Sequence, residues 1–467
     1  MATAIHAHQA ANKPSAAILA ASSFAFIIVQ LDVTIVNVAL PSIGAELGAS
    51  VAALQWVVDA YTLGFAVLLL AAGSLGDKFG ARRVFLGGFA LFALASAACA
   101  LAPGALALNL ARACQGVGAA LLVPSSLAIL NASYAHDKQR LAKAVGWWTA
   151  AGGVSIAAGP VLGGLLLGVG GWRGIFWVNV PICIAGFLLT RAVVPPSPAR
   201  DPGRAFDLAG QVLSILGLTA FIAVVIELHA LGWANRALQA GLLFAIVCGA
   251  AFLWVESRVA SPMLPLGLFR SRAFSGAVLF GVLVNFSYYG VIFVLSFYLQ
   301  TARHLSVMQT GLTFLPLTAT FIFSNIASGA LAARAGLRLP MVLGGVIACA
   351  GYALLARIGI SAQAGLTEML PGLVLIPAGM GLAVPAMTTS ILGSVARSQA
   401  GTASAVLNTA RQVGGAVGVA AYGAMVAAGS NEAITAGVRA TLWVSAGLLG
   451  AAAVLAWWSI RSVRGKA

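Results

Sequence analysis

The stretch Gly73-Ser-Leu-Gly-Asp-Lys-Phe-Gly-Ala-Arg-Arg83 returns later in the chain as Gly329-Ala-Leu-Ala-Ala-Arg-Ala-Gly-Leu-Arg338. One constant offset relates the matching residues, which are Gly73 and Gly329, Leu75 and Leu331, Lys78 and Arg334, Gly80 and Gly336, and Arg82 and Arg338. Each copy lies between two long apolar runs. The sequence therefore predicts a duplicated protein whose apolar segments are joined by equivalent short loops.

The composition places these apolar segments in a membrane. Of the 467 residues, 61% are hydrophobic and 8% are charged, whereas about a quarter of the residues in a soluble protein are charged. Apolar runs of about 20 residues are long enough to cross roughly 30 Å of hydrocarbon as a helix. The alternating polarity that a membrane barrel needs is not seen. We therefore expect an all-α integral membrane protein.

We expect fourteen membrane-spanning helices. Their ranges are 16–43, 51–74, 83–103, 105–131, 143–168, 173–194, 207–229, 237–256, 273–300, 306–332, 339–360, 365–393, 398–428 and 437–460. An even number puts both termini on one side. Most of the 26 Lys and Arg residues fall in the tails and in the loops on that side, and positively charged short loops stay cytoplasmic. The sequence thus predicts a multi-pass protein of the cell membrane with both termini cytoplasmic.

The net charge of +15 has the same explanation, because cytoplasmic loops attract anionic lipid headgroups. The alternative, a nucleic-acid partner, is the less favoured one, and we expect none. The first 15 residues are polar and show no cleavage pattern, so the first span is predicted to be retained. The five cysteines are scattered through apolar runs without metal-ligand spacing. We expect no metal site.

The repeat also predicts the domain organisation. The first loop copy joins the second and third spans, and the second copy joins the tenth and eleventh, so the halves are displaced by eight spans instead of six. Two helices must have been added between two six-helix bundles. We expect an N-terminal bundle over residues 1–194, a linker with two extra helices over 195–260, and a C-terminal bundle over 261–467. Duplicated bundles of this kind are typical of secondary transporters that work by alternating access.

Several motifs resemble those of the 14-span drug:proton antiporters of the major facilitator superfamily. They are Leu31-Asp-Val-Thr-Ile-Val-Asn-Val-Ala-Leu-Pro41 in the first span, the loop Gly73 to Arg83, Arg112-Ala-Cys-Gln-Gly-Val-Gly118 in the fourth span, Gly159-Pro-Val-Leu-Gly-Gly164 in the fifth, and Trp172-Arg-Gly-Ile-Phe-Trp-Val-Asn-Val-Pro181 after it. The resemblance covers nearly the whole chain. It implies a major facilitator fold and a proton-coupled efflux antiporter of the inner membrane for drugs or other small molecules.

The chain departs from the family pattern at three places. Ala81 replaces a usual basic residue of the loop motif, Ser155 replaces the first glycine of the antiporter motif, and Ala333 stands in the second loop copy where the first has Asp77. Because serine is small, the antiporter motif should still permit close helix packing. A charge latch at the loops would be present in one half only.

Ionisable residues inside spans are costly and usually mark ion or substrate paths. Asp32 and Asp59 lie about 15 Å and 12 Å below the predicted outer surface, and Arg112 lies about 10 Å below it, at 1.5 Å per residue. The three residues are therefore expected to share one layer and to form the proton-coupling site. A carboxyl group there would hold or release a proton as the arginine moved. The alternative is a static ion pair that joins helices.

Two glycine-rich motifs are predicted to control conformation. Gly73, Asp77, Gly80, Arg82 and Arg83 form the loop motif, in which Asp77 is expected to hold a helix end and close a gate; the alternative is a solvated loop charge. Gly159, Pro160, Gly163 and Gly164 form the antiporter motif. Proline bends the span and the glycines admit a neighbouring helix. Ordinary small-residue packing is the alternative for this motif.

The substrate wall is predicted from polar and aromatic residues in the spans, mostly in the C-terminal half. The candidates are Asn37, Asn285, Phe286, Tyr288, Tyr289, Phe314, Thr318, Phe321, Asn325 and Arg411. Such a wall suits small amphipathic substrates, although lipid-facing or packing aromatics would show the same pattern. Arg411 is expected to bind an anionic substrate group or to pair with a backbone carbonyl.

The remaining expectations concern energy and partners. No phosphate-binding loop occurs in the sequence, so we expect no cofactor and a proton gradient as the energy source. No cluster of catalytic polar residues is found, and a membrane-embedded enzyme is the disfavoured alternative. The expected partners are protons, the substrate and the lipid bilayer, and we expect a monomer. Within transport, the alternatives are an exporter of one metabolite or natural product, or an organic-anion transporter.

Overall fold

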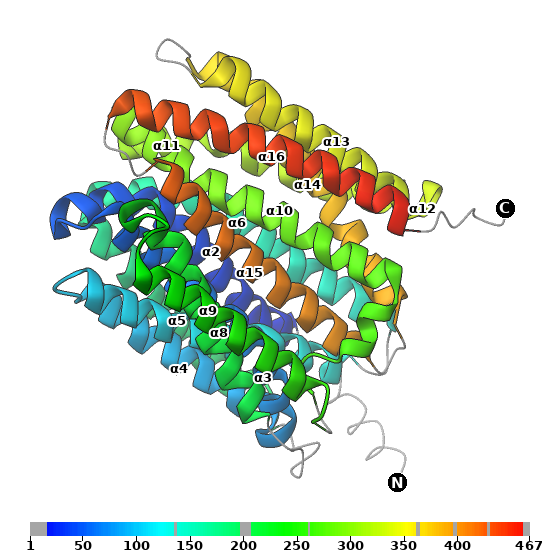
Figure 1. Cartoon of the computed structure of the whole chain (residues 1–467). Helices are drawn as coiled ribbons and strands as arrows, with labels where there is room; N and C mark the ends of the chain where they lie inside the picture. The colour runs from blue at the N-terminus through cyan, green and yellow to red at the C-terminus, as the bar shows by residue number, and fades with distance from the viewer. Residues whose placement is uncertain are drawn as a thin grey trace, which may run out of the picture.

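The computed structural model describes residues 16–134, 138–196, 207–259, 262–360, 365–395, 399–426 and 430–460. Across these ranges the secondary structure is helical, and no strand occurs (Figure 1). Helix α2 begins and helix α16 ends toward the same end of the bundle (Figure 1). We call the opposite end, which holds the turn between α2 and α3 at residues 47–51, the distal end.

The N-terminal half has six helices within the described residues. They are α2 (Ala16–Leu47), α3 (Val51–Phe79), α4 (Ala81–Ala100), α5 (Ala105–Ser133), α6 (Lys138–Trp177) and α7 (Asn179–Val193). Helix α2 packs on α6, and α5 packs on both α3 and α4. Helix α6 changes direction at Gly171, which has φ 62° and ψ −170°. The predicted boundary between the fifth and sixth spans falls at this glycine.

The rest of the chain follows the predicted order. It forms α8 (Leu208–Leu231), α9 (Arg236–Glu256), η1 (Leu266–Arg270), α10 (Arg272–Phe297), η2 (Tyr298–Ala302), α11 (Val307–Thr313), α12 (Leu315–Ala335), α13 (Arg338–Leu354), η3 (Leu355–Gly359), α14 (Leu366–Gly393), α15 (Ala400–Val426) and α16 (Asn431–Ser459). Helix α10 packs on α15 and α16, and α14 packs on α12 and α13.

The two copies of the short loop turn in the same way. Gly80 ends α3 with φ 87°, and Gly336 ends α12 with φ 77°. Each donates its backbone N–H to the carbonyl four residues earlier, Gly76 at 3.0 Å and Ala332 at 2.9 Å. Positive φ is open to glycine at little cost and strained for other residues. The matching glycines therefore have a matching structural reason, as expected for a duplicated fold.

The structure has fewer helices that meet the criteria of length and apolar character for a membrane span than the fourteen that the sequence predicted. Eleven helices of the described chain are long and apolar enough to cross a membrane, or up to twelve if the pair Val161–Trp177 and Asn179–Val193, bent by 43°, counts as one span. The count of fourteen is therefore not confirmed. Helix α15 is outside the count because Asn408, Arg411 and Gln412 interrupt its small apolar residues.

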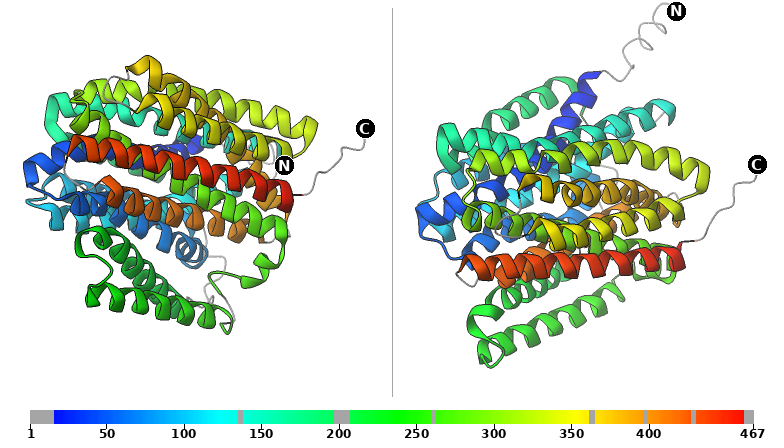
Figure 2. Two further views of the ribbon diagram at one scale, coloured as in Figure 1. Left: turned by 45° about the horizontal axis from the view of Figure 1, so that its top comes forward. Right: turned by 90° about the horizontal axis from the view of Figure 1, so that it is seen from above.

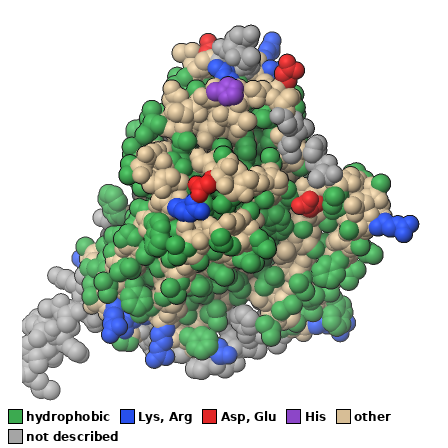
Figure 3. All heavy atoms as spheres, turned by 90° about the vertical axis from the view of Figure 1, so that its left-hand side faces the viewer, with side chains coloured by type: hydrophobic (Ala, Val, Ile, Leu, Met, Phe, Trp, Pro, Cys, Tyr) green, Lys and Arg blue, Asp and Glu red, His purple; other side chains and the backbone are tan. Residues whose placement is uncertain are grey.

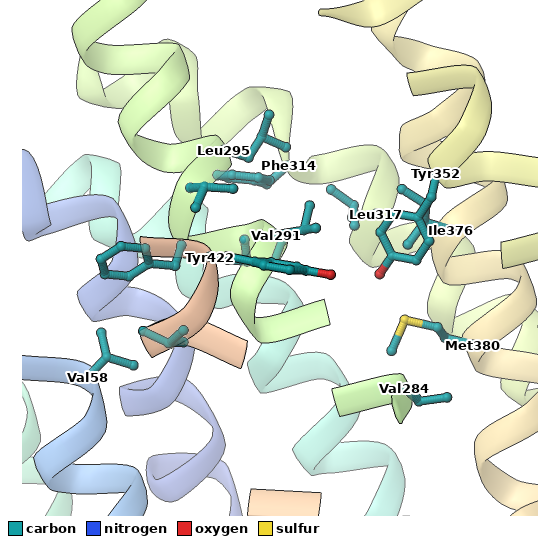
Figure 4. Close-up of a cluster of buried hydrophobic side chains, with 14 of the residues drawn as sticks. Val58, Val284, Val291, Leu295, Phe314, Leu317, Tyr352, Ile376, Met380 and Tyr422 are labelled. Carbon is teal, nitrogen blue, oxygen red and sulfur yellow. The ribbon is translucent and has the colours of Figure 1, made fainter. Parts of the chain in front are cut away.

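The two halves share a hydrophobic core. Ile35, Val58 and Leu108 from the first half join Phe280, Tyr352 and many others from the second. Figure 4 shows part of this core, where Val58 lies near Tyr422 and the C-terminal residues Phe314, Leu317 and Tyr352 come together. The distal face of the molecule carries scattered charged side chains of both signs, and its flanks are hydrophobic (Figure 3). Such flanks are suited to contact with lipid.

Helices α8 and α9 form a separate pair on one side of the bundle (Figure 2). Ile222 and Ile226 of α8 are buried against Leu63 of α3 and Ala416 of α15. Helix α8 therefore contacts both halves along the line where they meet. The outer surface of α9 exposes large apolar side chains, such as Ile246 and Trp254, as expected for a helix that faces lipid.

Candidate functional site

The centre of the N-terminal half holds a buried carboxylate with three donors. Asp32 of α2 is fully buried and pairs with the guanidinium of Arg112 on α5. Its second oxygen, Oδ1, accepts a hydrogen bond from Gln115 Nε2 at 2.8 Å and one from Asn179 Nδ2 at 2.9 Å. These donors come from α5 and α7, so one carboxylate joins three helices.

Arg112 is equally well satisfied although it is 1% exposed. Its Nε donates to the carbonyl of Val57 on α3 at 2.9 Å, and its terminal nitrogen also donates to Gln115 Oε1 at 2.6 Å. The guanidinium carbon lies 4.3 Å from the centre of the Tyr61 ring. A buried ion pair is tolerated only when its remaining donors and acceptors are bonded in this way.

Gln115, Asn179 and Ser96 complete the network and were not singled out from the sequence. Gln115 Nε2 also donates to Ser96 Oγ at 2.8 Å. Both amides lie within the quoted motifs, and Gln115 follows Arg112 by three residues, which puts the two side chains on one face of α5. The sequence could have indicated these three residues, because they are uncharged polar side chains inside spans at a depth similar to that of Asp32 and Arg112.

Asp59 lies apart from this network. It is fully buried on α3, and neither carboxyl oxygen has a hydrogen-bond partner among the described residues. Gln55, one turn earlier on the same face, donates through Nε2 to Val419 O at 3.3 Å and Ala420 O at 2.8 Å on α15. The structure thus brings Asp32 and Arg112 together, as predicted, and leaves Asp59 on the face of α3 that meets α15. Asp59 was predicted at a depth similar to that of Asp32, but its side chain lies on a different helix face and does not join the network.

The contact between α3 and α15, which we call the α3–α15 seam, joins the two halves. It contains the bonds of Gln55 and a hydrogen bond at 3.2 Å from Thr409 Oγ1 to the carbonyl of Ala66. A second link between the halves lies at the distal end, where Gln300 Nε2 donates to Val38 O at 3.0 Å. Gln55 and Gln300 therefore join the halves at or toward the distal end, and Thr409 joins them about 22 Å from the start of α3 at 1.5 Å per residue.

The antiporter motif packs α6 against two different neighbours. A Cβ added at Gly159 would lie 2.0 Å from Thr34 Oγ1, and one at Gly163 would lie 3.1 Å from Ile35 of α2. Gly164 faces α11 of the other half, where an added Cβ would lie 3.2 Å from Met308 Cα. The side chain of Pro160 lies outside the described residues. The motif thus provides close packing on α2 and one contact between the halves.

Replacement of Gly159 by valine is expected to push α6 away from α2 and to reduce transport at least tenfold, because the new Cβ overlaps the Thr34 side chain. Gly168→Val on the same helix is the matched control, since a Cβ there meets no atom within 4 Å. The measurement is efflux at equal membrane expression. Equal activity of the two variants would contradict the expected packing role.

The loop motif is seen in part. Arg82 donates to the carbonyl of Arg191, at the end of α7, at 2.8 Å, whereas Arg83 is exposed. Gly73 and Asp77 belong to α3, but the placement of the Asp77 side chain lies outside what the structure describes. The gate role of Asp77 stays a prediction.

The residues of the predicted substrate wall differ in their hydrogen bonds, ring contacts and burial. Asn37, Asn285 and Asn325 each donate at 2.8 Å to the carbonyl four residues earlier on their own helix. The Phe286 ring meets Tyr422 edge-on with centroids 5.1 Å apart, and the rings of Tyr288 and Tyr289 are 5.5 Å apart. Phe314 is 2% exposed within the shared core, and Phe321 is partly buried against it. The Thr318 side chain lies outside the described residues. Roles as substrate contacts stay predictions.

A bundle of long apolar helices with a buried ionic network between them is typical of a membrane transporter, as opposed to an enzyme. The chain belongs to the Major Facilitator Superfamily, whose family model matches residues 22–419. The fold agrees with solved structures of this type. It superimposes on the human organic anion transporter MFSD10 with a TM-score of 0.63 and 17% identity, covering 95% of this chain and 99% of that one, and on the nucleoside transporter NupG with a TM-score of 0.65 and 12% identity, covering 95% and 100%.

Similar curated proteins are named for resistance and export. The chain is 36% identical to the multidrug resistance protein Stp of Mycobacterium tuberculosis (strain CDC 1551 / Oshkosh), over 89% of this chain and 77% of Stp. It is 37% identical to the methylenomycin A resistance protein of Streptomyces coelicolor, over 88% and 86%. It is 38% identical to the puromycin resistance protein pur8 of Streptomyces alboniger, over 93% and 89%. All three relatives are thus named for resistance to drugs or antibiotics.

Proposed function

We propose that this transporter is a proton-coupled antiporter that exports small amphipathic molecules across the inner membrane by alternating access. The observation that carries the proposal is the fully buried Asp32 carboxylate, held by Arg112, Gln115 and Asn179. A buried ionisable group inside a membrane bundle is expensive and is usually kept for transport. The names of the relatives support drug or antibiotic export.

The coupling step that we propose is an exchange of partners at Asp32. In the described state the carboxylate is paired with Arg112. A motion of α5 relative to α2 that withdraws the guanidinium would leave a carboxylate in a low dielectric without its counter-ion, and the carboxylate would then take up a proton. Return of Arg112 expels that proton. The cycle therefore needs two positions of one contact and no cofactor.

The closed contacts between the halves fit one state of alternating access. Gln55 and Gln300 join the halves at or toward the distal end. With both termini cytoplasmic, as we propose from the charge pattern, this state is closed toward the outside. The proposed organisation remains two six-helix bundles with the pair α8 and α9 inserted, fourteen spans in all, working as a monomer.

A second candidate is an exporter dedicated to one natural product. It is favoured by the relatives that are named for a single antibiotic, such as methylenomycin A and puromycin. The range of substrates accepted by the purified protein separates the two candidates, because a dedicated exporter would discriminate among amphipathic compounds.

The proposed function predicts transport against a gradient in proteoliposomes with an imposed pH difference. Puromycin or ethidium is expected to accumulate on the acidic side, and a protonophore should stop the accumulation within seconds because it removes the driving force. ATP should have no effect. Accumulation that survives the protonophore, or that requires ATP, would contradict proton coupling. Protein-free liposomes and the Asp32→Asn protein are the controls.

A further inference from the structure

Arg411 is a partly buried cation for which the described residues provide no hydrogen-bond or ion-pair partner. It lies in α15, about 17 Å from the start of that helix at 1.5 Å per residue. The side chain is partly buried, and its Nε is enclosed without a hydrogen-bond partner in the described structure. No ion pair and no aromatic ring within the described residues receives its charge.

Other arginines show that this is unusual for the protein. Arg112 is paired with Asp32. Arg439, nearer a helix end in the same half, donates to the carbonyl of Ile360 at 2.6 Å. Arg338 stacks on Trp457 with its guanidinium carbon 3.5 Å from the ring centre. Of the two alternatives predicted for Arg411, pairing with a backbone carbonyl is therefore not what the described residues show.

The surroundings place Arg411 on the inner face of the C-terminal half. A Cβ added at Gly281 of α10 would lie 3.1 Å from Arg411 Cγ and 3.1 Å from Met387 Sδ of α14, so the side chain leaves α15 between these two helices. Next to it, the Tyr289 ring covers Gly415, where a Cβ would be 2.8 Å from Tyr289 Cδ2. The Tyr289 phenol and the Arg411 guanidinium are close enough to interact electrostatically.

Tyr289 reaches the boundary between the halves. It packs against the core that the two halves share and also against the N-terminal cluster that contains Tyr61. Tyr61 in turn carries the Arg112 guanidinium on its ring. Arg411 therefore lies beside Tyr289, and Tyr289 contacts the N-terminal helices that hold the proposed proton site.

The position of Arg411 is fixed by the backbone around it. A Cβ at Gly414 would be 2.6 Å from Val282 O, and one at Gly418 would be 2.1 Å from Phe286 O. Helix α15 thus packs directly on α10, and a small shift of the helix would not bring Arg411 out of the bundle. A buried charge without a partner is costly. Its retention is explained if the partner is a molecule that enters the protein.

Building on the export function proposed above, we propose that Arg411 and Tyr289 bind one anionic group of the exported molecule, a carboxylate or a group of the same shape and charge. The planar guanidinium presents paired donors that match a carboxylate, and the Tyr289 hydroxyl supplies a further donor. The neighbouring rings of Phe286 and Tyr288 offer apolar surface for the body of the molecule. Among the amphipathic molecules that the transporter exports, those that carry one anionic group are thus expected to bind most tightly.

A matched pair of dyes tests the proposal with the full-length protein in lipid nanodiscs. Rhodamine B carries a free carboxylate, and its ethyl ester does not. Fluorescence anisotropy is expected to show tighter binding of the carboxylate dye to wild type. Arg411→Gln should weaken binding of the carboxylate dye tenfold or more, as expected for a charge-assisted bond, and should not weaken binding of the ester, which is a net cation. Arg411→Lys should lose less, and Tyr289→Phe should lose about threefold.

Arg357→Gln is the control, because Arg357 is an exposed arginine of η3 in the same half. Equal affinity of wild type for the two dyes would overturn the proposal, and so would a parallel loss of both dyes in Arg411→Gln at an unchanged unfolding temperature. If Arg411→Gln fails to fold, Arg411→Lys and Tyr289→Phe serve instead. A loss of affinity for the carboxylate dye alone would support the proposal, and an equal loss for both dyes would overturn it. Selective binding through Arg411 without transport driven by a pH gradient would support this site and contradict the proposed function instead.

Discussion

Asp32→Asn is expected to reduce transport driven by a pH gradient to the level of empty liposomes. The amide keeps the shape of the side chain but cannot take up and release a proton, and it replaces the counter-ion of Arg112 with a neutral group. Because breaking a buried ion pair costs about 3 to 5 kcal/mol, the unfolding temperature should also fall. The measurement is uphill substrate accumulation at equal protein content.

Exchange of labelled for unlabelled substrate across the membrane separates a coupling defect from a folding defect. Such exchange needs no net proton movement, so it should continue in Asp32→Asn. Asp32→Glu, which keeps an ionisable group, should retain some uphill transport. Uphill accumulation by Asp32→Asn at the wild-type rate would remove Asp32 from the proposed proton site.

Asp59→Asn is expected to hold the α3–α15 seam closed at all pH values. Neither oxygen of Asp59 has a partner in the described state, so a negative charge there would be buried and uncompensated, and this state requires a bound proton. Raising the pH removes that proton and should shift wild type away from the closed seam. The neutral amide is insensitive to pH, so the variant should stay closed and lose at least 90% of its transport.

Distances between spin labels measure the state of the seam. The labels are placed at Ala49, before α3, and at Asn431, after α15, in a variant whose five native cysteines have been replaced. They report the distance across the distal end of the α3–α15 seam. In wild type, the fraction with a longer distance should grow as the pH rises from 6 to 9, whereas Asp59→Asn should show no such change. Thr62→Ala is the control, because the Thr62 hydroxyl bonds to Val58 O of its own helix. An identical pH response in wild type and Asp59→Asn would exclude Asp59 as the sensor.

The pairing of Asp32 with Arg112 at the proposed proton site shows what residue positions in a sequence can predict. Asp32 and Arg112 meet because depth follows from the fixed rise of a helix, and a lone acid and base at similar depths have a strong reason to pair. The same arithmetic placed Asp59 with them, because depth carries no information on the direction in which a side chain points. That direction is decided by which helix packs against α3, and the packing depends on glycines far away in the chain.

The fold was predictable where local chemistry decides it. Gly80 and Gly336 end their helices with positive φ, as the repeated loop indicated, and most helix ends lie within several residues of the predicted ranges. The number of spans was harder to establish, because the hydropathy of α15 is too low for a membrane span although the helix packs on α10 and α3 inside the bundle. Arg411 lowers the apolar character of that helix and is also its most informative residue.

Helix α8 has a consequence for the energy of the transport cycle. It lies in the groove between α3 and α15, with Ile222 and Ile226 touching both halves, while α9 covers it with a surface of exposed apolar side chains. A rotation of one half against the other must therefore carry this pair along or slide past it. Either movement changes the perimeter that the molecule presents to the hydrocarbon. In the proposed alternating-access cycle, bilayer thickness and lateral tension would thus contribute to the balance between the two states.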